Sequence, residues 1–121
     1  MTPKELLKQA RAKIVGSTWI QGTYAMDDVG EECLPDDSKA VGFCVYGALY
    51  SVLGTHADDE ADTPEELVSA LHRLRVAIAG SESPDILDRL FLADWNDLPK
   101  RTEEEVLAAF DKAIESVEAA T

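Results

Sequence analysis

The sequence predicts a mainly α-helical protein, a compact bundle of about five helices around a buried central helix at residues 40–53, with a small β-hairpin or ordered loop near residues 18–34. Three observations predict this. Apolar residues recur every three or four positions over long stretches. A helix-start signature, Thr-Pro followed by glutamate, occurs twice. The run from Ala40 to Leu53 contains no charged residue, although 29% of all residues are charged.

The first helix is predicted from Thr2 to the Gly16-Ser17 pair. Thr2 can cap it, Pro3 suits the first helical position, and Glu5 completes a capping box. Its apolar stripe consists of Leu6, Leu7, Ala10 and Ile14. The basic residues beside that stripe would suit either a docking face or a solvated face that complements acidic neighbours, and we prefer the second interpretation.

Residues 18–34 change in character. Thr18 to Met26 is rich in aromatic and β-branched residues, Asp27 to Gly30 is a turn signal, and a short return strand can follow. A lone hairpin is only marginally stable, so it has to lie against the helices, with Trp19 as its anchor.

The central helix at 40–53 is apolar on almost every side, which is typical of a helix surrounded by other elements. Asp37 or Ser38 is the expected cap. Gly42 and Gly47 would each cost about 1 kcal/mol relative to alanine inside a helix. That cost predicts a close approach of another backbone at these positions. Gly54 fits the residue just past the helix end.

Three further helices are predicted towards the C-terminus. One runs from Thr63 to Gly80, the next opens at Ser83 and is broken at Trp95–Pro99, and the last begins at Thr102. The stripe of the first of these consists of Leu67, Leu71, Leu74 and Ile78, with Val68 beside them. The stripe of the last consists of Val106, Leu107, Phe110, Ala113, Ile114 and Val117.

Length and composition indicate a single helical domain over residues 1–121, large enough to bury a core without a disulfide or a metal. No apolar run reaches the roughly 20 residues that a membrane span needs. The first residues lack the apolar stretch of a secretory signal. We therefore expect a cytoplasmic protein in which Cys33 and Cys44 stay reduced.

The net charge of −13, from 24 acidic and 11 basic residues, restricts the partners. Nucleic-acid affinity comes largely from Lys and Arg that neutralise phosphates, so direct nucleic-acid binding is excluded. Acidic membranes are disfavoured for the same reason. A basic protein partner is electrostatically easier, although the charge also serves solubility alone. A homo-oligomer is compatible with the sequence.

Cys44 is the only plausible nucleophile. A thiol near a helix N-terminus can have a lowered pKa, but catalysis also needs a base such as His56 or His72 and an orienting group such as Asn96. A cysteine about two turns into an apolar helix is instead typical of a small buried hydrophobe. We therefore expect no catalytic residue, with Cys44 as the one weak candidate.

No metal site or cofactor is expected. The acidic run from Asp58 to Asp62 lacks the spacing of a calcium loop, and the two Cys and two His lack the paired spacing of a zinc site. No glycine-rich phosphate loop, Rossmann fingerprint or HExxH motif is present in the sequence.

Two groups of residues are candidates for binding. Trp95-Asn96-Asp97 could present a hydrogen-bonding edge to a ligand, or could close the core and bond the bend before Pro99. Trp19, Gln21 and Tyr24 could form a small-molecule pocket or a protein hot spot, or could anchor the hairpin. The binding candidates are therefore Trp19, Gln21, Tyr24, Trp95, Asn96 and Asp97.

Four segments taken together resemble a known family: Trp19–Gly22, Phe43–Leu49, Trp95–Thr102 and Glu104–Leu107. The family is a domain-of-unknown-function family (family 6197) of small actinobacterial and actinophage proteins, and the resemblance covers most of the chain. It implies no activity and no cofactor. Its marked positions match Trp19, Cys44, Gly47, Trp95, Asn96 and Asp97. Neither histidine belongs to the pattern, which argues against a Cys–His mechanism.

The leading hypothesis is a non-enzymatic acidic accessory protein that binds a protein partner, in the setting of a phage or mobile element acting on a host factor. One alternative is an acidic DNA-mimic decoy that occupies the site of a DNA-binding protein. Another is a small-molecule binder or enzyme that uses the region of Trp19, Cys44 and Trp95-Asn96-Asp97.

Overall fold

The computed structural model describes residues 2–54, 65–79 and 94–119. Helix α1 (Pro3–Val15) begins as predicted, because the Thr2 hydroxyl accepts a hydrogen bond from the Glu5 backbone N–H at 3.1 Å and Pro3 stands in the first turn. The predicted stripe of this helix is fully buried: Leu6, Leu7, Ala10 and Ile14.

The prediction of an all-helical bundle is wrong. Among the described residues, four strands of two residues each form a mixed sheet beside the helices, so the fold is α+β. The strands are β1 (Thr18–Trp19), β2 (Ala25–Met26), β3 (Glu32–Cys33) and β4 (Gly42–Phe43). Their order across the sheet is β1-β4-β2-β3, with β1 parallel to β4 and the other two pairings antiparallel.

The hairpin predicted near residues 18–34 corresponds to β2 and β3. The Asp27 carboxylate holds its turn by accepting hydrogen bonds from the backbone N–H groups of Val29 at 3.0 Å and Glu31 at 2.9 Å. Gly30 takes the predicted positive φ, at +83°. The sequence reasoning missed β4, which inserts between β1 and β2, because two residues cannot show strand alternation.

Helix α2 (Val45–Leu53) is shorter than the predicted central helix at 40–53. Residues 42–43 are strand, and Cys44 is the N-cap, so the predictions of Asp37 or Ser38 as cap and of Cys44 two turns into the helix are wrong. The run is uniformly uncharged, so periodicity cannot separate its strand from its helix. Gly54 ends the helix at φ +70°, as predicted.

The predicted close approach of two backbones occurs at Gly47. A Cβ placed there would lie 2.7 Å from the carbonyl carbon of Tyr24 and closer still to its oxygen. Gly42 lies in β4 instead of a helix, where a Cβ would lie 3.0 Å from the Ile20 side chain. Glycine at position 47 therefore lets the first turn of α2 press against the chain just before β2.

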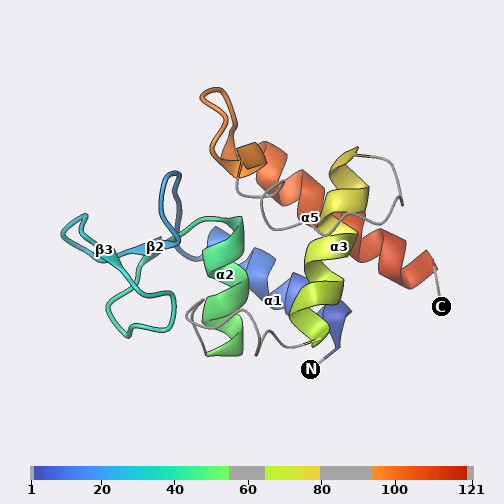
Figure 1. The fold of residues 1–121 in the computed structure, drawn as a ribbon, viewed down its shortest axis with the longest axis horizontal. Helices are drawn as coiled ribbons and strands as arrows, with labels where there is room; N and C mark the ends of the chain where they lie inside the picture. Colours follow the sequence, from blue (N-terminus) through green and yellow to red (C-terminus); the bar gives the residue numbers. More distant parts are fainter. Residues whose placement is uncertain (1, 55–64, 80–93, 120–121) are drawn as a thin grey trace.

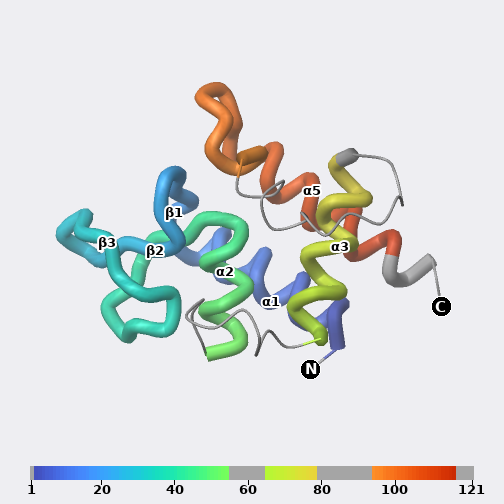
Figure 2. The backbone as a smooth tube through the Cα atoms, in the orientation of Figure 1, coloured from blue at the N-terminus to red at the C-terminus, as the bar shows by residue number. Residues whose placement is uncertain are grey.

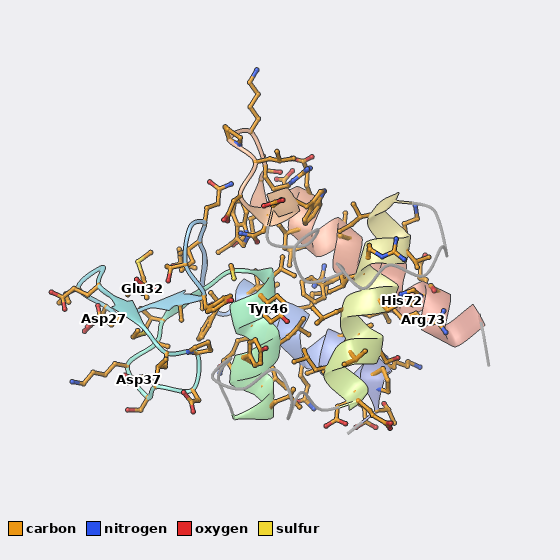
Figure 3. All side chains as sticks on the ribbon, viewed as in Figure 1. Asp27, Glu32, Asp37, Tyr46, His72 and Arg73 are labelled. Atoms are coloured by element: carbon orange, nitrogen blue, oxygen red, sulfur yellow. The ribbon has the colours of Figure 1, made fainter. Side chains whose placement is uncertain are left out.

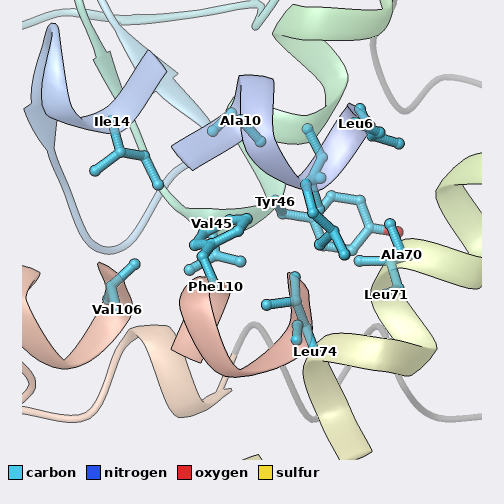
Figure 4. Packing of buried hydrophobic residues seen from close by; sticks show 14 of the residues in the cluster. Leu6, Ala10, Ile14, Val45, Tyr46, Ala70, Leu71, Leu74, Val106 and Phe110 are labelled. Atoms are coloured by element: carbon cyan, nitrogen blue, oxygen red, sulfur yellow. The ribbon is translucent and has the colours of Figure 1, made fainter. Parts of the chain in front are cut away.

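The remaining helices, α3 (Glu65–Ala79) and α5 (Glu103–Ala119), pack against each other and against α1, as Figure 1 shows. Their inward side chains meet those of α1 and α2 in one core, seen in Figure 4, where Tyr46, Leu74 and Phe110 come together from three helices. The predicted stripes of α3 and α5 are thereby confirmed for the described side chains except Val68, which is 52% exposed on α3. None of the described helices combines the length and apolarity that a membrane span requires.

The sheet and its loops lie at one end of the molecule, α3 and α5 lie at the other, and α2 lies between them (Figure 2). The β2–β3 hairpin therefore lies at the opposite end of the molecule from α3 and α5, although Ala25 of β2 is still part of the buried core. The predicted helix opening at Ser83, His56 and the acidic run from Asp58 to Asp62 fall outside the described residues.

Candidate functional site

The two predicted binding groups meet at Asn96, which is only 2% exposed. Its side-chain oxygen accepts hydrogen bonds from the Trp19 indole N–H at 2.8 Å and from the Val45 backbone N–H at 3.1 Å. Its amide nitrogen donates to the Ile20 carbonyl at 3.1 Å and to Asp97 Oδ1 at 3.0 Å. One buried amide therefore joins β1, the start of α2 and the segment at residues 94–98, a helical turn followed by a bend.

Gln21 and Asp97 tie the same bend to the chain after β1. The Gln21 side chain donates to the carbonyls of Asn96 at 2.9 Å and Leu98 at 2.8 Å. Asp97 Oδ1 accepts from the Gly22 backbone N–H at 3.0 Å. We call Trp19, Gln21, Asn96 and Asp97 the Asn96 cluster. These side-chain atoms already form hydrogen bonds within the protein, so they are not available to bind a ligand.

Trp95 packs against the core from the same bend. The Arg101 guanidinium lies 4.1 Å from the centre of the Trp95 ring and donates from Nε to the Trp95 carbonyl at 3.1 Å. Arg101 also forms an ion pair with Glu105 at 2.8 Å. The pKa of Glu105 is lowered, first by its hydrogen bond with the Thr102 backbone N–H and further by Arg101. This arrangement is the capping box at the start of α5.

Cys44 does not have the environment of a nucleophile. Its sulfur accepts a hydrogen bond from the Gly47 N–H at 3.2 Å. Burial nonetheless raises the pKa of the thiol to about 11, with Asp97 adding to the rise and the backbone N–H groups opposing it. The thiol is therefore protonated at neutral pH, and His72 on α3 is not among the groups that shift its pKa. Both cysteines are free thiols.

Tyr24 lies apart from the Asn96 cluster in its side-chain contacts. Its ring makes a tilted contact with Tyr46 and an edge-on contact with Tyr50, with centres 5.7 Å and 6.3 Å away, and the residue is still 39% exposed. It borders an open cleft of about 250 Å³. The residues that line this cleft are Gly22, Thr23, Tyr24, Glu32 and Asp97.

Sequence reasoning missed Thr23 and Glu32, because neither stands in a motif and only the sheet brings them to Asp97. Within the part of the chain that the structure describes, the Thr23 hydroxyl oxygen is buried without a hydrogen-bond partner. Glu32 is exposed on β3, at the edge of the sheet. The cleft therefore combines two carboxylates, an aromatic ring and an unpaired hydroxyl.

The hairpin beside this cleft is strongly acidic. Residues 27–37, which we call the acidic lobe, contain six acidic residues and no basic one: Asp27, Asp28, Glu31, Glu32, Asp36 and Asp37. Figure 3 shows Asp27, Glu32 and Asp37 on this lobe, far from His72 and Arg73 on α3. Together with burial, which is the larger cause, these three carboxylates raise the pKa of Cys33.

Two apolar side chains stand exposed within the acidic lobe. Val29 at the tip of the hairpin is 74% exposed, and Leu34 after β3 is 51% exposed. Within residues 2–54, 65–79 and 94–119, no group of three or more His, Cys, Asp or Glu is placed to hold a metal ion. The lobe thus presents carboxylates interspersed with apolar contacts and lacks the geometry of a metal centre.

The comparisons with known proteins give a family without an assigned activity. A model described as a family of unknown function, DUF6197, matches residues 1–116, so the chain belongs to this family. No curated protein and no solved structure matches the chain.

Proposed function

We propose that this protein is a non-enzymatic binding module whose acidic lobe docks onto a basic surface of a protein partner. The observation that carries the proposal is the composition of the lobe, six acids without a base in eleven consecutive residues, at the opposite end of the molecule from α3 and α5. We further propose the cytoplasmic, phage or mobile-element setting suggested by the family resemblance.

Electrostatics and apolar contact would play separate roles in such an interface. A surface of one charge sign steers an oppositely charged partner and speeds association. Affinity in protein interfaces comes mostly from a few buried apolar or aromatic anchors. Val29 and Leu34, exposed among the carboxylates, are suited to supply such anchors.

The alternative of an enzyme at Trp19, Cys44 and Trp95-Asn96-Asp97 has less support. The Cys44 thiol is protonated and buried. The Asn96 amide already makes four hydrogen bonds within the protein. This region therefore offers neither an activated nucleophile nor an open set of donors.

The test is a pair of charge variants with equal loss of charge. Asp28→Asn with Glu31→Gln removes two carboxylates from the lobe, and Glu103→Gln with Glu104→Gln removes two exposed carboxylates from α5. Zero-length carboxyl–amine crosslinking in host lysate identifies the protein that contacts the lobe. That protein is then purified and its affinity measured for each variant.

The lobe variant should bind the purified partner about tenfold more weakly than wild type, since each exposed charge pair contributes roughly two- to fivefold. The α5 variant should bind within twofold of wild type. Raising the salt concentration should weaken wild-type binding and reduce the difference between the variants. Equal binding by both variants, or crosslinks confined to the helices, would overturn the proposal. Competition by duplex DNA would identify the partner as a DNA-binding protein, the DNA-mimic alternative.

A further inference from the structure

The cleft between the acidic lobe and the Asn96 cluster has the chemistry of a receptor for one planar cation. Its carboxylates come from two distant segments, Glu32 on β3 and Asp97 in the bend before α5. Its volume of about 250 Å³ lies below the range typical of drug-sized ligands. A single side-chain head group is therefore a better match than a cofactor.

We propose that this cleft receives an arginine side chain of the protein partner. The inference rests on the proposed function, which it deepens by naming the group that enters the site. Arginine is favoured over lysine because its planar guanidinium presents five donors in a fixed fork and stacks on aromatic rings.

The Asp97 side chain is already ordered in the free protein. The two hydrogen bonds that it accepts from described residues, from the Gly22 backbone N–H and the Asn96 amide, both go to Oδ1. Oδ2 is left as an acceptor on a side chain whose position is already fixed. A carboxylate that is ordered before binding loses little further freedom when it pairs with a cation.

Tyr24 supplies the aromatic surface. Its ring contacts those of Tyr46 and Tyr50, the residue is 39% exposed, and it lines the cleft. A guanidinium over a tyrosine ring within about 6 Å is attracted by the ring electrons. The same kind of contact exists inside this chain, where Arg101 lies 4.1 Å from the centre of the Trp95 ring.

Thr23 provides an observation independent of charge. Its hydroxyl oxygen is buried and has no hydrogen-bond partner, which is a cost in the free protein. Thr23 also lines the cleft, so a guanidinium bound there could donate to this oxygen. Binding would then satisfy a group that folding leaves unsatisfied.

The test uses the full chain labelled with ¹⁵N and the capped peptide acetyl-Gly-Arg-Gly-amide. Matched peptides carry citrulline, which has the shape of arginine without the charge, or lysine. The arginine peptide should shift the amide signals of Gly22, Thr23 and Tyr24. The citrulline peptide should leave them unchanged, and the lysine peptide should bind at least about threefold more weakly.

Two variants probe the cleft itself. Glu32→Gln should weaken the arginine peptide by about two- to fivefold. Thr23→Val should weaken it as well while the melting temperature stays equal to or above that of wild type. Glu104→Gln on α5 is the control, which should bind as wild type does. Indistinguishable shifts from the arginine and citrulline peptides, or shifts confined to other parts of the chain, would overturn the inference.

The two proposals fail in different ways. Loss of partner binding in the Asp28→Asn, Glu31→Gln variant, together with no response to the arginine peptide, would support the docking lobe and overturn the cleft. An arginine-specific response at Gly22 and Thr23, with partner binding insensitive to both lobe charges, would support the cleft and overturn the docking lobe.

Discussion

Replacing Gly47 by alanine should destabilise the fold by about 3 kcal/mol, although the same change usually stabilises a helix by about 1 kcal/mol. The new Cβ would lie 2.7 Å from the Tyr24 carbonyl carbon and closer to its oxygen. The obstacle is backbone, so no rotamer change relieves it. Overpacking of this severity costs about 3 kcal/mol.

Relief of the collision would bring a second loss. Moving the Tyr24 carbonyl away would break its hydrogen bond with the Cys44 N–H, now 3.2 Å long, at a cost of about 1 kcal/mol. It would also strain the neighbouring pairing of Ala25 with Phe43. The overpacking and the lost bond together exceed the helix gain by about 3 kcal/mol.

Urea denaturation followed by circular dichroism measures this difference, and the melting temperature should fall by roughly 10 °C. Gly16→Ala is the matched control, because Gly16 has a φ of −83° and its Cβ would lie 3.3 Å from the Ala12 carbonyl oxygen. It should change the free energy of unfolding by less than about 1 kcal/mol. A Gly47→Ala protein as stable as wild type would refute the close contact between α2 and Tyr24.

Two further predictions concern the Asn96 cluster and the adjoining thiol. Asn96→Ala leaves the Trp19 indole N–H and the Val45 backbone N–H without their acceptor. The free energy of unfolding, measured by urea titration, should therefore fall by about 3 kcal/mol. A loss below about 1 kcal/mol would contradict the central role of this amide. The pKa of Cys44 is raised from 9.0 to about 11 in the folded protein, so its contribution to stability is present below pH 9 and is lost as the pH rises towards 11. The loss is about 3 kcal/mol, since the pKa difference is about two units and each unit is worth roughly 1.4 kcal/mol. It should be missing from the pH profile of Cys44→Ala, and parallel profiles of the two proteins would contradict the buried protonated thiol.

The helices of this fold could be predicted from local chemistry. The Thr2 cap of α1 is present as expected, α5 begins after Thr102 with a reciprocal capping box, and most of the apolar stripe behind each cap is buried. These signals lie within one or two turns of chain, where side-chain spacing maps directly onto a helix face. The same reasoning found the glycine at position 47 whose backbone meets another segment.

Beyond the β2–β3 hairpin, the sheet could not be predicted in this way. Phe43 of β4 pairs with Trp19 on one side and with Ala25 on the other, over strands of two residues that are too short to alternate. The apolar run that contains β4 therefore read as one continuous helix. The N-cap role of Cys44 was missed as a result, and a thiol is also not among the usual cap residues.

The candidate site shows the same division. Trp19 and Asn96 were each singled out by residue type, but they stand 77 positions apart and periodicity cannot show that they bond. Because these polar groups bond to each other, the acidic lobe and the cleft beside it are the better candidates for a binding surface. Glu32 and Thr23 become candidates for binding only because the sheet places them in one cleft with Asp97.

The most direct test of the central claim is the affinity of the purified crosslinked partner for the two charge-matched variants, measured by titration calorimetry. Binding through the acidic lobe predicts a loss of about tenfold for Asp28→Asn with Glu31→Gln and less than twofold for Glu103→Gln with Glu104→Gln. An equal loss in both variants, or no loss in the first, would contradict the account.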